Sequence, residues 1–142
     1  MPSFTVELPN LLQAGPILEV GIAVPSIVEE SLRKAGQSIP MPIKTIAMID
    51  PGATVTVFRE DMVQQLNLRP VGTTLINTPS STNVQCYEYF VRLLFPNNVI
   101  VETLGISVSL QGQHITCLVG RDILQHGVFI YTGYHNSFTL CF

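Results

Sequence analysis

The sequence predicts a mainly β domain, a closed or partly closed barrel with two or three short helices. Ten prolines and ten glycines are spread along its 142 residues, so the elements between them are short. Most of these segments are rich in β-branched and aromatic residues, and only a few have a helical pattern. Because no repeat or linker divides the chain, residues 1–142 are expected to form one domain with one core.

Strands are predicted wherever a short apolar or alternating run lies between turn residues. The polar segment PSSTN, residues 79–83, separates two such runs and is the expected turn of a hairpin. YHN, residues 134–136, is the expected turn of the last hairpin. In chain order, the predicted strands cover residues 4–8, 17–24, 43–49, 54–58, 72–78, 84–95, 99–110, 114–120, 128–133 and 137–142.

Three segments favour short helices. In residues 26–36, Ser26 is the expected N-cap, and Glu29 three residues later completes a capping box. Gly36 is placed to end this helix. The other two helical segments are residues 59–68 and residues 121–127.

The chain is poor in charge. Charged residues make up 12% of it, where about 25% is usual for soluble domains. This indicates that part of the surface is covered by a partner, such as a second copy of the chain. Seven Lys and Arg stand against ten Asp and Glu with no basic run, which argues against a nucleic-acid partner.

The sequence also favours the cytoplasm over a membrane or an oxidising compartment. The N-terminus lacks the basic and apolar regions of a signal peptide, and no apolar stretch reaches the roughly 20 residues that span a bilayer. Cysteines are odd in number and lie in apolar or strand-like segments, so we expect buried thiols rather than disulfides. They are Cys86, Cys117 and Cys141.

No metal site or cofactor is expected. The three histidines are not spaced as metal ligands, and no CxxC accompanies them. They are His114, His126 and His135.

The segment TIAMIDPGATVTVF, residues 45–58, contains the first candidate catalytic residue. An acid, Asp50, ends an apolar run and is followed by Pro51 and Gly52 before a β-branched run begins. The tripeptide Asp-Pro-Gly by itself predicts a type II turn, in which Gly52 supplies the positive φ. Both flanks, however, are more apolar than those of a surface turn. We expect a carboxylate held there to be partly desolvated, which favours proton transfer.

A second motif follows much later in the chain. In ITCLVGRDIL, residues 115–124, an apolar strand ends in Gly-Arg-Asp and a short helix begins. Together, AMIDPGATVTVF and CLVGRDIL resemble the two motifs of the retropepsin-like aspartic proteases, single-lobe relatives of the retroviral protease that include small bacterial members. The polar hairpin lies between them, where this family has its flap. The last segment, residues 137–142, lies where the family has its dimer-forming terminus.

The resemblance implies the acid-protease fold, with one closed-barrel lobe per chain, and hydrolysis of peptide bonds without a cofactor. In this chemistry two adjoining carboxyl groups share a proton, so one activates a water while the other donates to the substrate carbonyl. The chain has one Asp-x-Gly-Ala segment, so the second carboxyl has to come from another copy in a homodimer. Strand acids elsewhere are expected to point outward, namely Glu7, Glu19, Glu88 and Glu102.

The resemblance also implies roles for individual residues. Asp50 is the catalytic acid and base. Arg121 and Asp122 support the Asp50 loop from beneath, with a solvent-facing residue at a helix start as the alternative for Arg121. Contacts to an extended peptide substrate come from the turn and from the flap, at Gly52, Ala53, Thr78, Pro79, Ser80 and Ser81.

Pro51 departs from the family, which has Thr or Ser at this position hydrogen-bonding across the dimer axis. Proline has neither the hydroxyl nor the N–H. One alternative to the protease is therefore a retropepsin-like domain that binds peptides or forms an assembly with weak or no catalysis. A second alternative is an unrelated β-barrel interaction domain in which Asp-Pro-Gly is only a turn.

Overall fold

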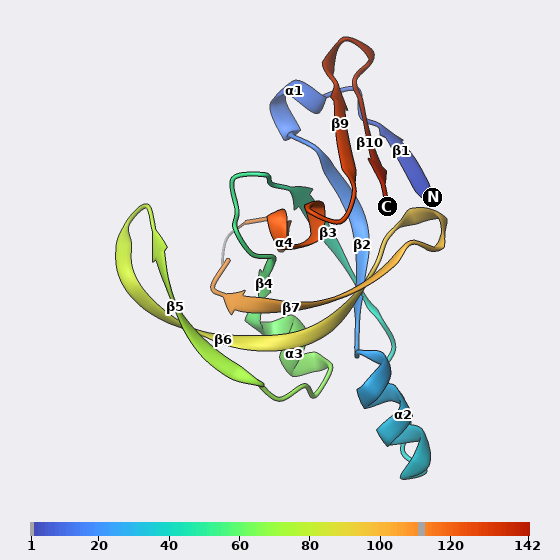
Figure 1. Ribbon diagram of the computed structural model, residues 1–142, viewed down its shortest axis with the longest axis vertical. Helices are drawn as coiled ribbons and strands as arrows, with labels where there is room; N and C mark the ends of the chain where they lie inside the picture. The colour runs from blue at the N-terminus through green and yellow to red at the C-terminus, as the bar shows by residue number, and fades with distance from the viewer. Residues whose placement is uncertain (1, 111–112) are drawn as a thin grey trace.

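The computed structural model describes residues 2–110 and 113–142, and in them ten strands form two sheets (Figure 1). The mainly β fold class is therefore confirmed. The strands are β1 (Ser3–Glu7), β2 (Ile17–Ala23), β3 (Ile43–Ile49), β4 (Val57–Arg59), β5 (Gly72–Thr78), β6 (Ser81–Leu94), β7 (Ile100–Val108), β8 (Cys117–Val119), β9 (Val128–Thr132) and β10 (Ser137–Cys141).

The larger sheet brings the two sequence motifs together. Its strand order is β2-β3-β8-β4-β7-β6-β5. β3 and β8 run parallel with Ile49 beside Val119, so the residues that follow both strands lie at the same end of the sheet. β4, which follows the Asp50 turn, is antiparallel to β8.

β2 also pairs with β6, at Gly21–Ala23. The pairings therefore form a circuit from β2 through β3, β8, β4, β7 and β6 back to β2. Side chains from several of these strands belong to the main buried cluster, among them Ile22, Ile49, Phe58 and Leu93, each no more than 1% exposed. Burial of each such side chain stabilises the fold by about 1.5–3 kcal/mol.

The smaller sheet joins the two ends of the chain. Its order is β1-β10-β9, and Figure 1 shows the two termini side by side. Its inner face is apolar, with Phe4, Phe138 and Leu140 all buried. β10, the strand that the resemblance places at a dimer contact, is paired along both edges within its own chain. The outer edges of this sheet belong to β1 and β9.

The described residues contain four α-helices, so the expectation of two or three is wrong. They are α1 (Leu11–Ala14), α2 (Ser26–Lys34), α3 (Glu60–Gln65) and α4 (Arg121–Leu124). The missed helix, α1, is a single turn that is too short to show helical periodicity in the sequence. Leu11, which is 1% exposed, anchors it to the core.

The two ends of α2 are held differently from each other. Ser26 is not the N-cap but the first helical residue, after Pro25, and its backbone N–H donates to Glu102 Oε1 over 2.6 Å. The capping-box prediction is therefore wrong, because a carboxylate from β7 satisfies this end of the helix. At the other end Gly36 follows the C-cap with φ of +69°, and its N–H donates to Arg33 O, as the sequence predicted.

Strand ends near the motifs differ from the prediction. Residues 54–56 form a loop before β4, and residues 114–116 lie outside β8. The hairpin turn consists of Pro79 and Ser80 alone, since β6 already begins at Ser81. The tip is polar but still pairs, with a register shift between Ile76 and Thr78.

The cysteines match the expectation of free thiols, with Cys86 and Cys117 buried and Cys141 half-buried. Within the described part of the chain, no helix combines the length and the apolar character needed to cross a membrane.

Candidate active site

Asp50 begins a hydrogen-bonded turn at the end of β3. The turn is closed by the Ala53 N–H, which donates to Asp50 O over 3.0 Å. The Asp50 N–H donates to Val119 O over 2.9 Å and so ties the turn to β8. The side chain is half-buried, and its Oδ1 accepts from the Gly52 N–H over 2.9 Å. Backbone hydrogen bonds thus hold the turn, and the bond from Gly52 orients the carboxylate.

Gly52 serves the turn differently from what was expected. Its φ lies outside the left-handed region, so the turn is not type II. What glycine supplies here is space, because a Cβ on Gly52 would lie 3.0 Å from Asp50 Oδ1. A side chain at this position would press on the carboxylate.

The second motif is hydrogen-bonded to the loop that follows Asp50. The Arg121 N–H donates to Ala53 O over 2.9 Å, and the Asp122 N–H donates to Thr54 O over 3.2 Å. Arg121 also reaches the loop with its guanidinium, donating to Pro51 O over 2.7 Å and to Thr54 Oγ1 over 3.0 Å. Although exposed, Arg121 therefore bonds to the loop and does not simply face solvent.

Asp122 joins the loop to β7 through hydroxyl groups. Its Oδ1 accepts from Thr56 Oγ1 over 2.8 Å, and its Oδ2 accepts from Thr103 Oγ1 over 3.2 Å. Thr56 is fully buried and also accepts from the Gly120 N–H over 3.1 Å. Sequence reasoning missed Thr56 and Thr103. For Thr56 the available signal was a hydroxyl within the apolar run of the first motif, but its partner and the position of Thr103 depend on strand pairing.

Gly120 permits the close approach of the two motifs. A Cβ at this position would lie 2.6 Å from the carbonyl carbon of Val55 and 3.0 Å from Ala53 O. Real side chains do not tolerate such contact with backbone atoms. The Gly of the Gly-Arg-Asp motif is thus required for the loop to lie against β8.

The charge of Asp122 also acts on a buried thiol. Burial, and next the negative charge of Asp122, raise the pKa of Cys117 to about 12. Cys117 is 0% exposed and belongs to the core, so it stays a neutral thiol.

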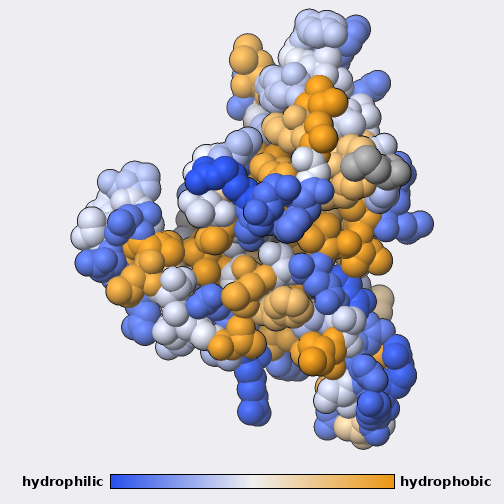
Figure 2. Space-filling model, in the orientation of Figure 1, coloured by the Kyte–Doolittle hydropathy of each residue, from blue (hydrophilic) through white to orange (hydrophobic). Residues whose placement is uncertain are grey.

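The Asp50 loop forms one wall of a groove, here called the loop cavity, of about 630 Å³. Gly52, Ala53 and Thr54 line this wall, and the opposite wall comes from the hairpin of β5 and β6 with part of β7. In Figure 2, hydrophobic surface gathers where the hairpin meets the rest of the molecule.

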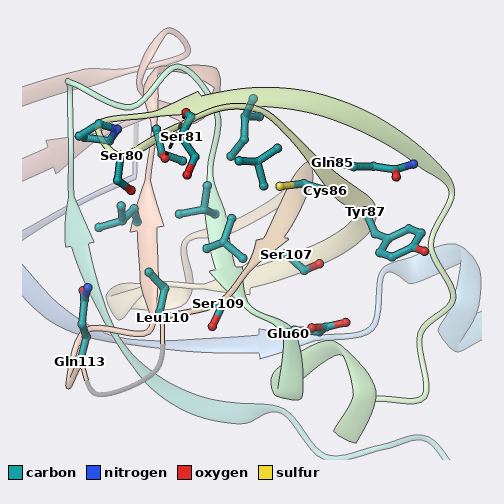
Figure 3. A pocket seen from close by; sticks show the side chains of 17 residues that line it. Glu60, Ser80, Ser81, Gln85, Cys86, Tyr87, Ser107, Ser109, Leu110 and Gln113 are labelled. Atoms are coloured by element: carbon teal, nitrogen blue, oxygen red, sulfur yellow. Dashed lines mark hydrogen bonds between the residues drawn. The ribbon is translucent and has the colours of Figure 1, made fainter.

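A second space, the hairpin cavity, has a volume of about 780 Å³ and lies beneath the hairpin tip (Figure 3). Val57 and Ile76 line both cavities. In Figure 3, Cys86 points toward the other lining side chains, with Glu60 on the opposite wall. Four of the predicted substrate contacts line this cavity, Thr78, Pro79, Ser80 and Ser81.

The predicted site residues thus fall into four groups. Asp50 stands at the turn, Gly52 and Ala53 line the loop cavity, and Arg121 with Asp122 bonds to the loop from below. The predicted flap residues are exposed at the hairpin tip. No cluster of potential metal ligands occurs in residues 2–110 and 113–142.

Comparison with known proteins supports the fold. No protein-family model and no curated protein matches this sequence. Among solved structures, the crystal structure of a retropepsin-like aspartic protease from Rickettsia conorii is similar, with a TM-score of 0.55. The similarity covers 98% of this chain and 90% of that chain at 11% sequence identity. The protein therefore has a fold like that of a retropepsin-like aspartic protease.

Proposed function

We propose that this protein is an aspartic endopeptidase whose active site forms between the two chains of a homodimer. The observation that carries the proposal is the Asp50 turn, which lies beside a groove. Backbone hydrogen bonds orient this turn, and the second motif supports it through Arg121. It occurs in a chain whose fold is similar to that of a retropepsin-like aspartic protease. The circuit of strand pairings supports the closed barrel of that fold.

Two Asp50 side chains on the dimer axis share one proton. The ionised carboxylate removes a proton from a bound water, and the protonated carboxyl donates to the carbonyl oxygen of the peptide bond. The two titrations belong to the pair, so activity is expected at mildly acidic pH. Gly52 and Ala53 hold the backbone of an extended peptide, while the hairpin covers it.

The surface of the chain is compatible with a partner of its own kind. β9 is an outer strand of the smaller sheet, and Val128 and Ile130 on it are each 51% exposed. It follows α4 closely in the chain, and α4 begins with the residues that brace the Asp50 loop. An apolar outer strand near the loop offers a contact that a second copy can cover.

A peptide library incubated with the purified protein between pH 4 and 7 tests the proposal. Asp50→Asn should abolish cleavage without loss of fold. Asp61→Asn is the matched control, because Asp61 pairs with Arg59 outside both cavities. Cleavage by Asp50→Asn at the parental rate would show that Asp50 is not the catalytic acid.

Mixing the parent with Asp50→Asn tests the shared dyad. If both chains refold together in equal amounts, only parent–parent dimers carry two aspartates, and activity per parent chain falls to about half. Unchanged activity per parent chain would contradict a site built from two chains. Sedimentation measurements should show a dimer in both samples.

Pro51 favours one other function, peptide binding without turnover. Position 51 offers no N–H to a partner chain, whereas its carbonyl already accepts from Arg121. Pro51→Thr supplies the missing donors and keeps that carbonyl, so an active protease should retain or gain activity. A parent that binds peptides and cleaves none at any pH would favour the binding function.

A further inference from the structure

One carboxylate stands in an otherwise uncharged groove. Glu88 is the only charged residue among those that line the loop cavity. The sequence predicted that it points outward, but the side chain is half-buried and faces the groove. The walls beside it are apolar or carry hydroxyl groups, at Thr74, Ile76, Leu104 and Ile106.

Strand register explains the position of Glu88. It lies opposite Gly72 on β5 and opposite Ile106 on β7, so its side chain stands on the same face of the sheet as Ile106. Gly72 leaves the space that the carboxylate occupies, since a Cβ there would lie 3.2 Å from Glu88 Oε1. The groove thus has a carboxylate directly beside an apolar wall.

Glu88 has no basic partner in the described part of the chain. The ion pairs there involve other acids, and Arg69, shortly before β5, is in none of them. No Lys or Arg lines the loop cavity or the hairpin cavity, and the one charged residue of the hairpin cavity is again an acid, Glu60. An unpaired carboxylate in a half-buried position attracts a cation more strongly than one in open solvent.

We propose that the loop cavity selects peptides carrying Arg or Lys at the residue that reaches Glu88. The methylene stem of such a side chain packs against Leu104 and Ile106, while its charged end meets the carboxylate. Arg is favoured over Lys, because the guanidinium can bond to both carboxylate oxygens at once. This preference rests on the proposed function, since it requires an extended peptide in the loop cavity.

Peptide binding and peptide cleavage test this preference separately. Sets of extended apolar octapeptides, each with Arg, Gln or Glu at one scanned position, are bound to the Asp50→Asn variant and followed by fluorescence polarisation. The same sets are cleaved by the parent and compared by kcat/KM. At one position Arg should exceed Gln by about fivefold, as expected for a partly exposed ion pair, and Glu should be worst.

Glu88→Gln should remove the advantage of Arg over Gln while leaving the Gln peptide unaffected. Glu60→Gln tests the other cavity and should leave this preference in place. Glu19→Gln changes a strand acid that lines neither cavity and serves as the surface control.

The outcomes separate the two proposals. Peptides that are cleaved with no preference for Arg would overturn the selectivity and leave the protease intact. Binding without that preference would also overturn the selectivity. A preference that disappears in Glu60→Gln and persists in Glu88→Gln would overturn the assignment to Glu88. Absence of both binding and cleavage for every peptide would overturn the proposed function and the selectivity with it.

Discussion

Thr56→Val tests whether a single buried hydroxyl holds the two motifs together. Thr56 is 0% exposed, donates to Asp122 Oδ1 over 2.8 Å and accepts from the Gly120 N–H over 3.1 Å. Valine has nearly the same shape, so the change removes hydrogen bonds without opening a large cavity.

The expected loss follows from those two bonds. A hydrogen bond to a charged group contributes about 1.5–3 kcal/mol, and leaving a buried N–H without an acceptor costs about 1–3 kcal/mol. Allowing for relaxation of the loop, Thr56→Val should lower the free energy of unfolding by about 3 kcal/mol. This is a large part of the roughly 5–15 kcal/mol that stabilises a domain.

Urea unfolding of the purified protein measures this loss. With a slope of about 2 kcal/mol per molar urea, the midpoint should fall by about 1.5 M. Thr56→Ser keeps the hydroxyl and loses one methyl, at about 1 kcal/mol. Thr103→Val removes one half-buried bond to Asp122 and should also cost about 1 kcal/mol. A Thr56→Val variant no less stable than Thr103→Val would refute the role given to the buried hydroxyl.

Three further changes probe other parts of the structure. Gly120→Ala places a Cβ against the backbone of Val55 and should destabilise the protein by about 3 kcal/mol in the same urea assay, with loss of any peptide cleavage. Burial is the main cause that raises the pKa of Cys117 to about 12, above the value of 9.0 in the unfolded chain. The contribution of this thiol to the stability of the folded state is therefore fully present below pH 9. Stability should therefore fall between pH 9 and 12 by about 1.4 kcal/mol per pH unit, and Cys117→Ser should flatten that fall in pH-dependent unfolding. The pKa of Glu29 is lowered from 4.5 by its bond to Arg92 and then by Arg33, so its contribution is present above pH 4.5 and is lost as the pH falls below it. Glu29→Gln should lower the free energy of unfolding at pH 7 and weaken the dependence of that free energy on pH below 4.5. A variant whose stability falls below pH 4.5 as steeply as that of the parent would contradict this contribution of Glu29.

Several features follow from short stretches of sequence. The alternation of apolar residues and the turn residues predicted a mainly β chain, because strand and turn preferences act over a few neighbours. Gly36 was correctly placed after α2, since a helix end is satisfied by adjacent residues. The two motifs, with Asp50 and Gly120, were also recognisable, because each is a contiguous segment.

Other features depend on which strands pair and in which register. Parallel pairing of β3 with β8 sets Asp50 beside the second motif, and the register of β6 turns Glu88 into the groove. Ser26 lacks its predicted role because Glu102 reaches it from β7. The sequence by itself thus determined the local elements and the motifs. Only the tertiary structure decided their partners, since a shift of one residue in a strand turns every side chain to the opposite face.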